Sequence, residues 1–138
     1  MNTAHENDLA GKIGLLKGVS IFTTLADKEL VVVAQNSEFC SYRRGDVIFR
    51  EGSYSDGLYV IREGEVLITK QRDENETMNI AQFIAGESFG EMDLLENRAM
   101  SATARADSDA VLLVFPARGM KFRDVLGQYP DISARILH

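Results

Sequence analysis

The middle of the chain is divided by closely spaced turn signals, and this feature limits the possible folds more than any other. Each signal contains glycine or a run of polar residues, and they lie at residues 44–46, 52, 56–57, 63–65, 73–76 and 85–87. The segments between them are short and rich in Val, Ile, Phe and Tyr, as β-strands are. Turns at this spacing predict an antiparallel β-barrel or β-sandwich.

Four of these segments are predicted strands, at residues 58–61, 66–68, 78–84 and 110–115. The first two flank Glu63-Gly64, and Gly64 can adopt the positive φ that a tight turn requires. We therefore expect a β-hairpin at this point.

Helical spacing of apolar residues occurs on both sides of the strand region. Helices are predicted at residues 9–17, 27–35, 117–128 and 130–138. Thr24 or Asp27 is the expected N-cap of the second helix. The expected fold class is α+β, in a single domain over residues 1–138 with a polar N-terminal tail at 1–8 and a short C-terminal helix at 130–138.

Composition narrows the classes of function. The formal net charge is −6 and the basic residues are spread along the chain, so attraction to nucleic acid is not expected. The longest apolar runs are far shorter than the ~20 residues of a membrane-spanning helix, and the polar start lacks a signal peptide. A cytoplasmic protein without membrane contact is therefore expected. Because Cys40 is the single cysteine, an intrachain disulfide and a cysteine-based zinc site are excluded.

One segment carries a recognisable pattern: it reads FGEMDLL at residues 89–95, and SATA follows at residues 101–104. Together with the stretches at 16–25, 45–52 and 58–66, it resembles the cyclic-nucleotide-binding domain family, which includes the sensory domain of catabolite activator protein and the regulatory subunits of protein kinase A. The resemblance implies an antiparallel β-roll, a double-stranded jelly-roll-like barrel, with flanking N- and C-terminal helices. It also implies that residues 89–102 form a phosphate-binding cassette.

The resemblance places the ligand contacts in this cassette, at Phe89, Gly90, Glu91, Met92, Met100, Ser101 and Ala102. It implies that Gly90 lets the backbone approach the ligand and that Glu91 accepts a hydrogen bond from a ribose hydroxyl. Ser101 and the amide of Ala102 would face the cyclic phosphate. The residues alone leave another interpretation open, in which Gly90 forms a tight turn and Glu91 caps the short helix.

Two cassette positions depart from the family pattern. Met100 occupies the position of the phosphate-binding Arg, and Asp93 occupies the position of a small residue. Loss of an Arg–phosphate contact costs about 2–5 kcal/mol of binding free energy. A carboxylate ~6 Å from the phosphate adds roughly 3 kcal/mol of repulsion at an effective dielectric of about 20. A cyclic nucleotide, cAMP or cGMP, is thus expected to bind at least about 10³-fold more weakly than to an intact cassette.

Arg98 and Arg105 are alternative sources of positive charge near the cassette. Either guanidinium can turn toward the pocket and rescue phosphate binding, or Arg98 can pair with Asp93 and neutralise the site. The sequence leaves both outcomes open.

Two functions fit these residues. The first is a regulatory module that senses a small molecule without catalysis, because the chain has no catalytic triad, P-loop or paired-carboxylate cleft. Direct DNA binding is not expected, since only residues 131–138 follow Pro130. The alternative is a degenerate domain that binds no cyclic nucleotide and contacts a second copy or a partner protein. Its expected contact is an apolar strip on the C-terminal helix, formed by Ile132, Ile136 and Leu137.

Overall fold

The computed structural model describes residues 8–54 and 57–137. Residues 1–7 of the predicted polar tail at 1–8, and the last residue of the predicted C-terminal helix, His138, lie outside the described residues. In chain order the elements are α2 (Leu9–Leu16), a 3-10 turn η1 (Ser20–Phe22), α3 (Asp27–Gln35), β1 (Glu38–Tyr42), β2 (Val47–Phe49), β3 (Leu58–Glu63), β4 (Val66–Asp73), β5 (Glu76–Phe83), β6 (Ser88–Phe89), α4 (Glu91–Leu95), β7 (Thr103–Ala106), β8 (Ala110–Phe115), α5 (Phe122–Gln128) and α6 (Pro130–Leu137).

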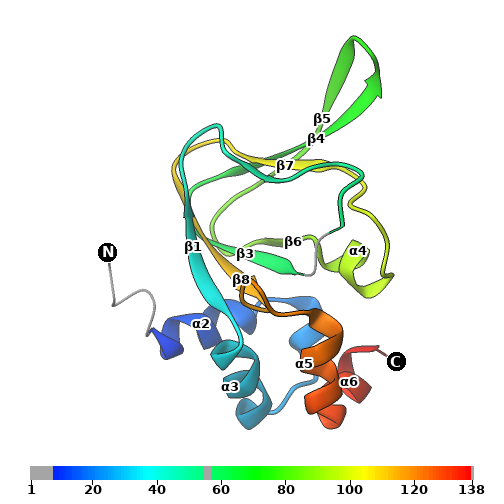
Figure 1. The fold of residues 1–138 in the computed structure, drawn as a ribbon. Coiled ribbons are helices and arrows are strands. Elements are labelled where there is room, and N and C mark those ends of the chain that lie inside the picture. Colours follow the sequence, from blue (N-terminus) through cyan, green and yellow to red (C-terminus); the bar gives the residue numbers. More distant parts are fainter. Residues whose placement is uncertain (1–7, 55–56, 138) are drawn as a thin grey trace.

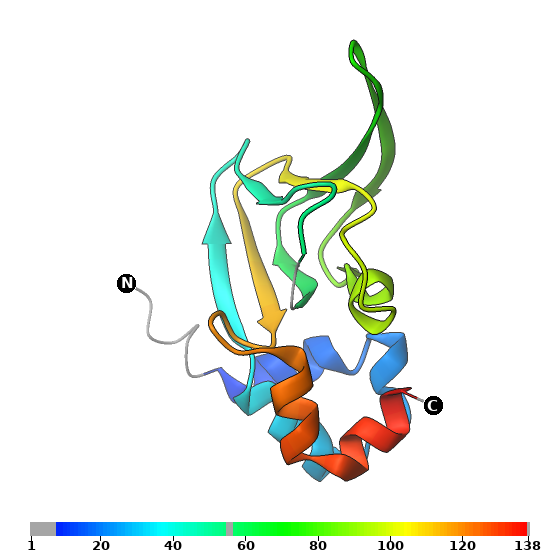
Figure 2. The same ribbon diagram turned by 45° about the vertical axis from the view of Figure 1, so that its right-hand side comes forward.

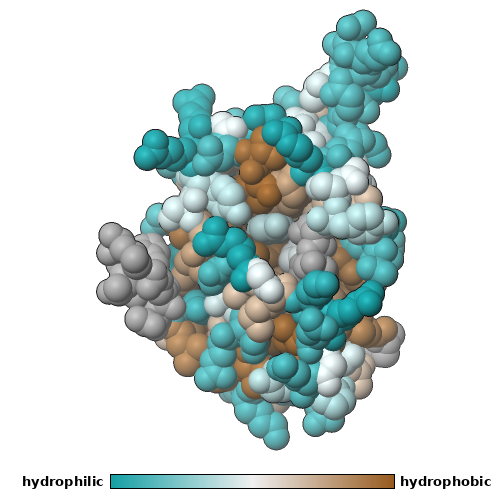
Figure 3. All heavy atoms as spheres, viewed as in Figure 1, coloured by the Kyte–Doolittle hydropathy of each residue, from teal (hydrophilic) through white to brown (hydrophobic). Residues whose placement is uncertain are grey.

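Two four-stranded sheets form an antiparallel roll (Figure 1). Their strand orders are β1-β8-β3-β6 and β2-β7-β4-β5. Strands β4 and β5 extend past the roll as a hairpin, and the tip of this hairpin is hydrophilic in Figure 3. The α+β class and the β-roll with flanking helices are therefore confirmed.

Helices α2, α3, α5 and α6 lie beneath the roll, and α5 (orange) contacts α6 (red), as Figure 2 shows. Strands β3 and β8 separate two apolar cores, because alternate side chains point to opposite faces of a strand. In β3, Leu58 and Val60 pack into the helical core, whereas Tyr59 and Ile61 pack inside the roll. In β8, side chains of residues 112–115 also pack alternately into the helical core and inside the roll. Both faces of this strand are therefore buried, which explains why it is apolar throughout.

The predicted hairpin at Glu63-Gly64 is wrong, because β3 and β4 belong to different sheets and do not pair, although a turn does connect them at Gly64. Gly64 has a φ of +95°, and a Cβ at this position would clash with the carbonyl oxygen of Asp109. Glycine is thus required at this turn for both its backbone angle and its small size.

Two local predictions were wrong at helix starts. Neither Thr24 nor Asp27 caps α3, because the N-cap residue is Ala26. The Ala26 amide donates to Glu29 Oε1 at 2.7 Å. Helix α5 begins at Phe122 and not at residue 117, since Gly119 has a φ of +89° and interrupts the helical spacing.

The prediction of an uncovered apolar strip on the C-terminal helix is also wrong for two of its three residues. Ile132 and Ile136 are buried in the helical core of this chain, whereas the Leu137 residue is 48% exposed. Within residues 8–54 and 57–137, no helix has the length and apolar character needed to cross a membrane.

Candidate functional site

The cassette helix α4 begins directly after Gly90, which has a φ of +86°. A Cβ on this residue would lie 3.4 Å from Tyr59 Cδ1 and 3.7 Å from Met100 Cε. At the other end of α4, Leu94 packs into the helical core. The cassette is therefore fixed to the roll on one side and to the helices on the other.

A cavity of about 360 Å³ lies between the cassette and the inside of the roll. Its apolar wall contains Ile68 and three aromatic rings, from Phe49, Phe83 and Phe89. The Phe83 and Phe89 rings stack with their centroids 5.7 Å apart, and Phe49 lies 6.0 Å from Phe89. Apolar surface is visible in the middle of the roll in Figure 3. This wall suits the flat apolar part of a small molecule.

Glu91 places a carboxylate at the edge of this cavity. The Ser88 hydroxyl donates to Glu91 Oε2 over a long 3.4 Å contact. Burial raises the pKa of the Glu91 carboxyl above its ordinary value, and the Ser88 hydrogen bond opposes this shift. Glu91 is therefore weakly partnered within the described chain and can accept a hydrogen bond from a ligand.

Asp93 lies two residues further along α4 in different surroundings. Its residue is 8% exposed, and its Oδ1 accepts from Arg98 Nε at 2.5 Å. Its Oδ2 accepts from the Ser101 amide at 3.1 Å and from the Ser101 hydroxyl at 3.0 Å. Burial alone would raise the pKa of Asp93, but these hydrogen bonds from Arg98 and Ser101 lower it. Asp93 is thus held as a carboxylate.

The model of the cyclic nucleotide-binding domain family matches residues 39–129, which include this cassette and most of the roll. The chain belongs to the cyclic nucleotide-binding domain family. The resemblance inferred from the sequence is thereby confirmed.

Known members of the family resemble the domain along most of its length. The regulatory subunit of the type II cAMP-dependent protein kinase from Drosophila melanogaster is 32% identical over 121 residues, and these cover 88% of this chain but only 32% of that subunit. The solved structure of cAMP-bound PfPKA-R matches with a TM-score of 0.77 and 28% identity, covering 89% of this chain and 42% of that one.

A third similar structure is a triply substituted regulatory subunit of a cAMP-independent protein kinase A from Trypanosoma brucei, described as bound to cAMP in its A site. It matches with a TM-score of 0.70 and 25% identity, over 92% of this chain and 46% of that one. The domain thus shares its fold with regulatory subunits, two of which are described with bound cAMP.

The structure brings most of the predicted site residues together around the roll cavity: Phe89, Gly90, Glu91, Met92, Asp93, Arg98, Ser101 and Ala102. Met100 is 3% exposed and lies behind Gly90, outside the cavity lining. Arg105 is exposed on β7 and donates from Nη1 to the Gly45 carbonyl at 3.1 Å. Of the alternatives left open by the sequence, Arg98 pairs with Asp93.

Four lining residues were not predicted from the sequence: Phe49, Ile68, Phe83 and Ser88. The alternation of buried Val66 and Ile68 along β4 was a usable signal for Ile68. Phe49 and Phe83 lie on β2 and β5, the two edge strands of one sheet, so their approach depends on pairings between distant segments.

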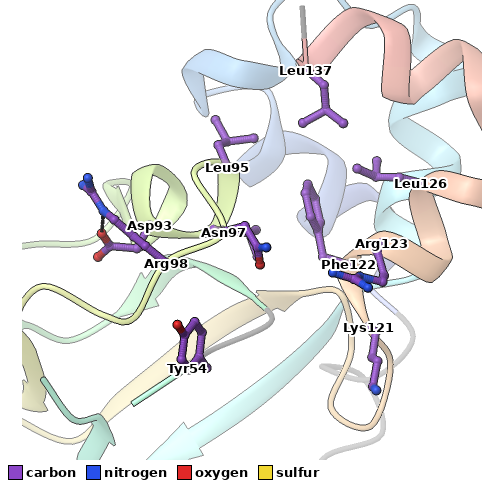
Figure 4. Close-up of a pocket in the computed structure, with 11 residues that line it drawn as sticks. Tyr54, Asp93, Leu95, Asn97, Arg98, Lys121, Phe122, Arg123, Leu126 and Leu137 are labelled. Atoms are coloured by element: carbon purple, nitrogen blue, oxygen red, sulfur yellow. Dashed lines mark hydrogen bonds and ion pairs between the residues drawn. The ribbon is translucent and has the colours of Figure 1, made fainter. Parts of the chain in front are cut away.

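A second cavity, of about 430 Å³, lies between the cassette and the C-terminal helices (Figure 4). Leu95 and Asn97 line it from the cassette, and Phe122, Leu126 and Leu137 line it from α5 and α6. Asp93 and Arg98 line this cavity as well as the one in the roll. Their ion pair therefore stands between the two cavities. Within the described part of the chain, no cluster of His, Cys, Asp and Glu could hold a metal ion.

Proposed function

We propose that this domain is a non-catalytic regulatory module that senses a small molecule in the roll, and that its atypical cassette binds cAMP and cGMP weakly. The observation that carries the proposal is the Asp93 carboxylate, which accepts hydrogen bonds from Arg98 and from two groups of Ser101. By family resemblance, Ser101 would otherwise face the phosphate. A cyclic phosphate would have to compete for these donors.

The energetic cost of this competition is large. A phosphate ~6 Å from the Asp93 carboxylate is repelled by roughly 3 kcal/mol at an effective dielectric of about 20. Met100 supplies neither charge nor donor, which removes about 2–5 kcal/mol that a desolvated Arg–phosphate contact contributes. The two effects act on the same bound state, so we expect a combined loss of at least about 10³-fold in affinity.

The Trypanosoma brucei subunit offers a parallel. Its structure with cAMP carries three substitutions: Glu to Ala, then seven positions later Thr to Arg, then Val to Ala at the next residue. Asp93 and Met100 are separated by the same seven positions in this chain. The substitutions replace an acid and supply an Arg, which are the two changes that this cassette would need. The parallel supports the proposed cause of weak cAMP binding.

The contacts of α4 suggest how the sensor would pass on its state. Leu94 packs in the same core as Phe122 and Leu126 of α5, and the Asp93–Arg98 pair borders the second cavity (Figure 4). A ligand that moved α4 would therefore change the packing of the C-terminal helices. This change in packing would then alter how α5 and α6 contact a partner protein.

Thermal unfolding with added cyclic nucleotide tests this proposal. Because a ligand raises stability by RT ln(1 + [L]/Kd), weak binding predicts no change in Tm at about 10 µM cAMP or cGMP and a rise of at most about 2 °C at about 1 mM. A rise of about 5 °C at about 10 µM would contradict it. The Asp93→Ala/Met100→Arg variant is the positive control.

The alternative function, an interaction module that binds no cyclic nucleotide, keeps one specific observation in its favour. Leu137 is exposed and lines the second cavity, which Lys121 and Arg123 also line, so this surface suits a partner segment with acidic and apolar residues. Sedimentation of wild type and Leu137→Asp tests a contact between two copies. The alternative predicts a dimer that this substitution dissociates, whereas the sensor proposal requires no such dimer.

A further inference from the structure

We propose that Asp93 is an internal substitute for a bound anion: its carboxylate fills the anion-binding donors of the cassette and leaves the pocket to uncharged or positively charged ligands. The inference rests on the proposed function and deepens it, because it assigns the chemical class of the ligand.

The donors around Asp93 form a complete anion site. Both carboxylate oxygens are bound, one by a guanidinium nitrogen of Arg98 and the other by an amide and a hydroxyl of Ser101. A guanidinium, a backbone amide and a hydroxyl are also the groups that bind phosphate oxygens in proteins. The Asp93 side chain is only 10% exposed, although the Arg98 side chain that donates to it is 52% exposed. Within this chain, a carboxylate therefore occupies a donor set suited to an external anion.

Further contacts, made by main-chain carbonyls and by Glu96, fix the loop between α4 and β7. The Arg98 amide donates to the Asp93 carbonyl at 3.1 Å, while the Arg98 guanidinium also pairs with Glu96. The Met100 amide donates to the Ser53 carbonyl at 2.8 Å. These contacts hold the loop without a contribution from any ligand phosphate.

The charges that line the roll cavity are unfavourable to an anion. Arg98 is the one basic residue among its described lining residues, and it is already paired with two carboxylates. Glu91 adds a further carboxylate with one weak partner. An anionic ligand would meet repulsion here, whereas an uncharged or cationic ligand could lie on Phe83 and Phe89 and donate to Glu91.

Inorganic phosphate is the probe for this inference, and Asp93→Ala is the variant. Removal of the carboxylate leaves Ser101 without its acceptor and Arg98 paired with Glu96 alone, so phosphate should enter the vacated site. We expect the Tm of Asp93→Ala to be about 3–5 °C higher in about 50 mM phosphate than in chloride of equal ionic strength. The wild type should differ by less than about 1 °C, because its donors are occupied. The Ser101 amide resonance should shift with phosphate in the variant alone.

Glu38→Ala is the matched control. Glu38 also accepts from a backbone amide and an Arg Nε, both of Arg118, but this pair lies on the open surface. Its Tm should be no more phosphate-dependent than that of the wild type. Adding Arg98→Ala to Asp93→Ala should abolish the phosphate effect.

If Asp93→Ala is unfolded in chloride, recovery of its near-UV circular dichroism on addition of phosphate supports the inference. An Asp93→Ala variant that gains no more from phosphate than the wild type, or that stays unfolded in phosphate, overturns it. The wild type's response to cAMP is measured separately, so weak cAMP binding can hold even when the internal-anion inference fails.

Discussion

The first turn of the cassette helix α4 carries two carboxylates, Glu91 and Asp93, in opposite environments. Glu91 faces the roll cavity with one long contact from Ser88, and burial raises its pKa. Asp93 accepts three hydrogen bonds from Arg98 and Ser101, which lower its pKa in spite of its burial. The comparison shows that two acids on one short helix can have separate roles: Glu91 is available to a ligand, whereas Asp93 is used within the chain.

Removal of the Asp93 carboxylate should have the largest effect on stability. Asp93→Ala leaves the amide and hydroxyl of Ser101 without their acceptor, and we expect a loss of about 2 kcal/mol in the free energy of unfolding. Arg98 contributes less to this loss because its side chain is 52% exposed and can be solvated. Urea denaturation measures the change.

Glu76→Ala is the control for that measurement. Glu76 pairs with Arg72 on the exposed hairpin, so its removal should cost less than about 0.5 kcal/mol. Equal losses for the two variants would show that the Asp93 contacts contribute no more than a surface ion pair.

The turn before Glu91 should show the next largest effect. Gly90→Ala forces a side chain into a backbone with positive φ and against Tyr59, at a cost of about 1–2 kcal/mol. Gly14→Ala, in the interior of α2 with open space around it, should instead stabilise the chain by about 0.5–1 kcal/mol. Thermal unfolding of both variants compares them. A Gly90→Ala variant as stable as the wild type would mean that the cassette can begin without this turn.

The smallest effects concern pH, and the two carboxylates should behave in opposite ways. A raised pKa means that folding disfavours the ionised Glu91, so Glu91→Gln should be more stable than the wild type at pH ~7, by less than about 1 kcal/mol. This gain should disappear as the pH falls below about 4, where the Glu91 carboxyl is protonated in both the folded and the unfolded state.

Asp93 should show the reverse dependence. Its lowered pKa stabilises the fold above the unfolded value of about 4, and this contribution is lost as the pH falls through the folded pKa. Asp93→Asn should therefore be less stable than the wild type at neutral pH, with a difference that shrinks in acid. Denaturant titrations at several pH values measure both differences. Parallel curves for the two variants would refute the assigned environments.

Much of the fold could be predicted from local patterns. The turn at Gly64 and the strand at residues 110–115 depend on glycine and on apolar runs, and both are present. The start of α5 could not be predicted in the same way, because Gly119 fits a helix by spacing but adopts a positive φ. The burial of Ile132 and Ile136 depends on packing against segments distant in sequence.

The candidate site likewise contains residues that could be predicted from a local pattern and residues that could not. Family resemblance led to residues 89–93, which are contiguous, and these line the roll cavity. Phe49 and Phe83 were missed because their approach depends on how distant strands are paired. The sequence left open whether Arg98 turns toward the pocket or pairs with Asp93. The geometry of the loop brings Arg98 to Asp93.

Calorimetric titration of cAMP into wild type and into Asp93→Ala/Met100→Arg is the sharpest test of why this cassette binds cAMP weakly. If Asp93 and the missing Arg are the cause of weak binding, the double variant should bind cAMP at least about 10³-fold more tightly than the wild type. Asp93→Ala alone should give part of this gain, since it removes the repulsion without supplying the Arg. Equal affinities for wild type and double variant, whether both weak or both tight, would contradict the account.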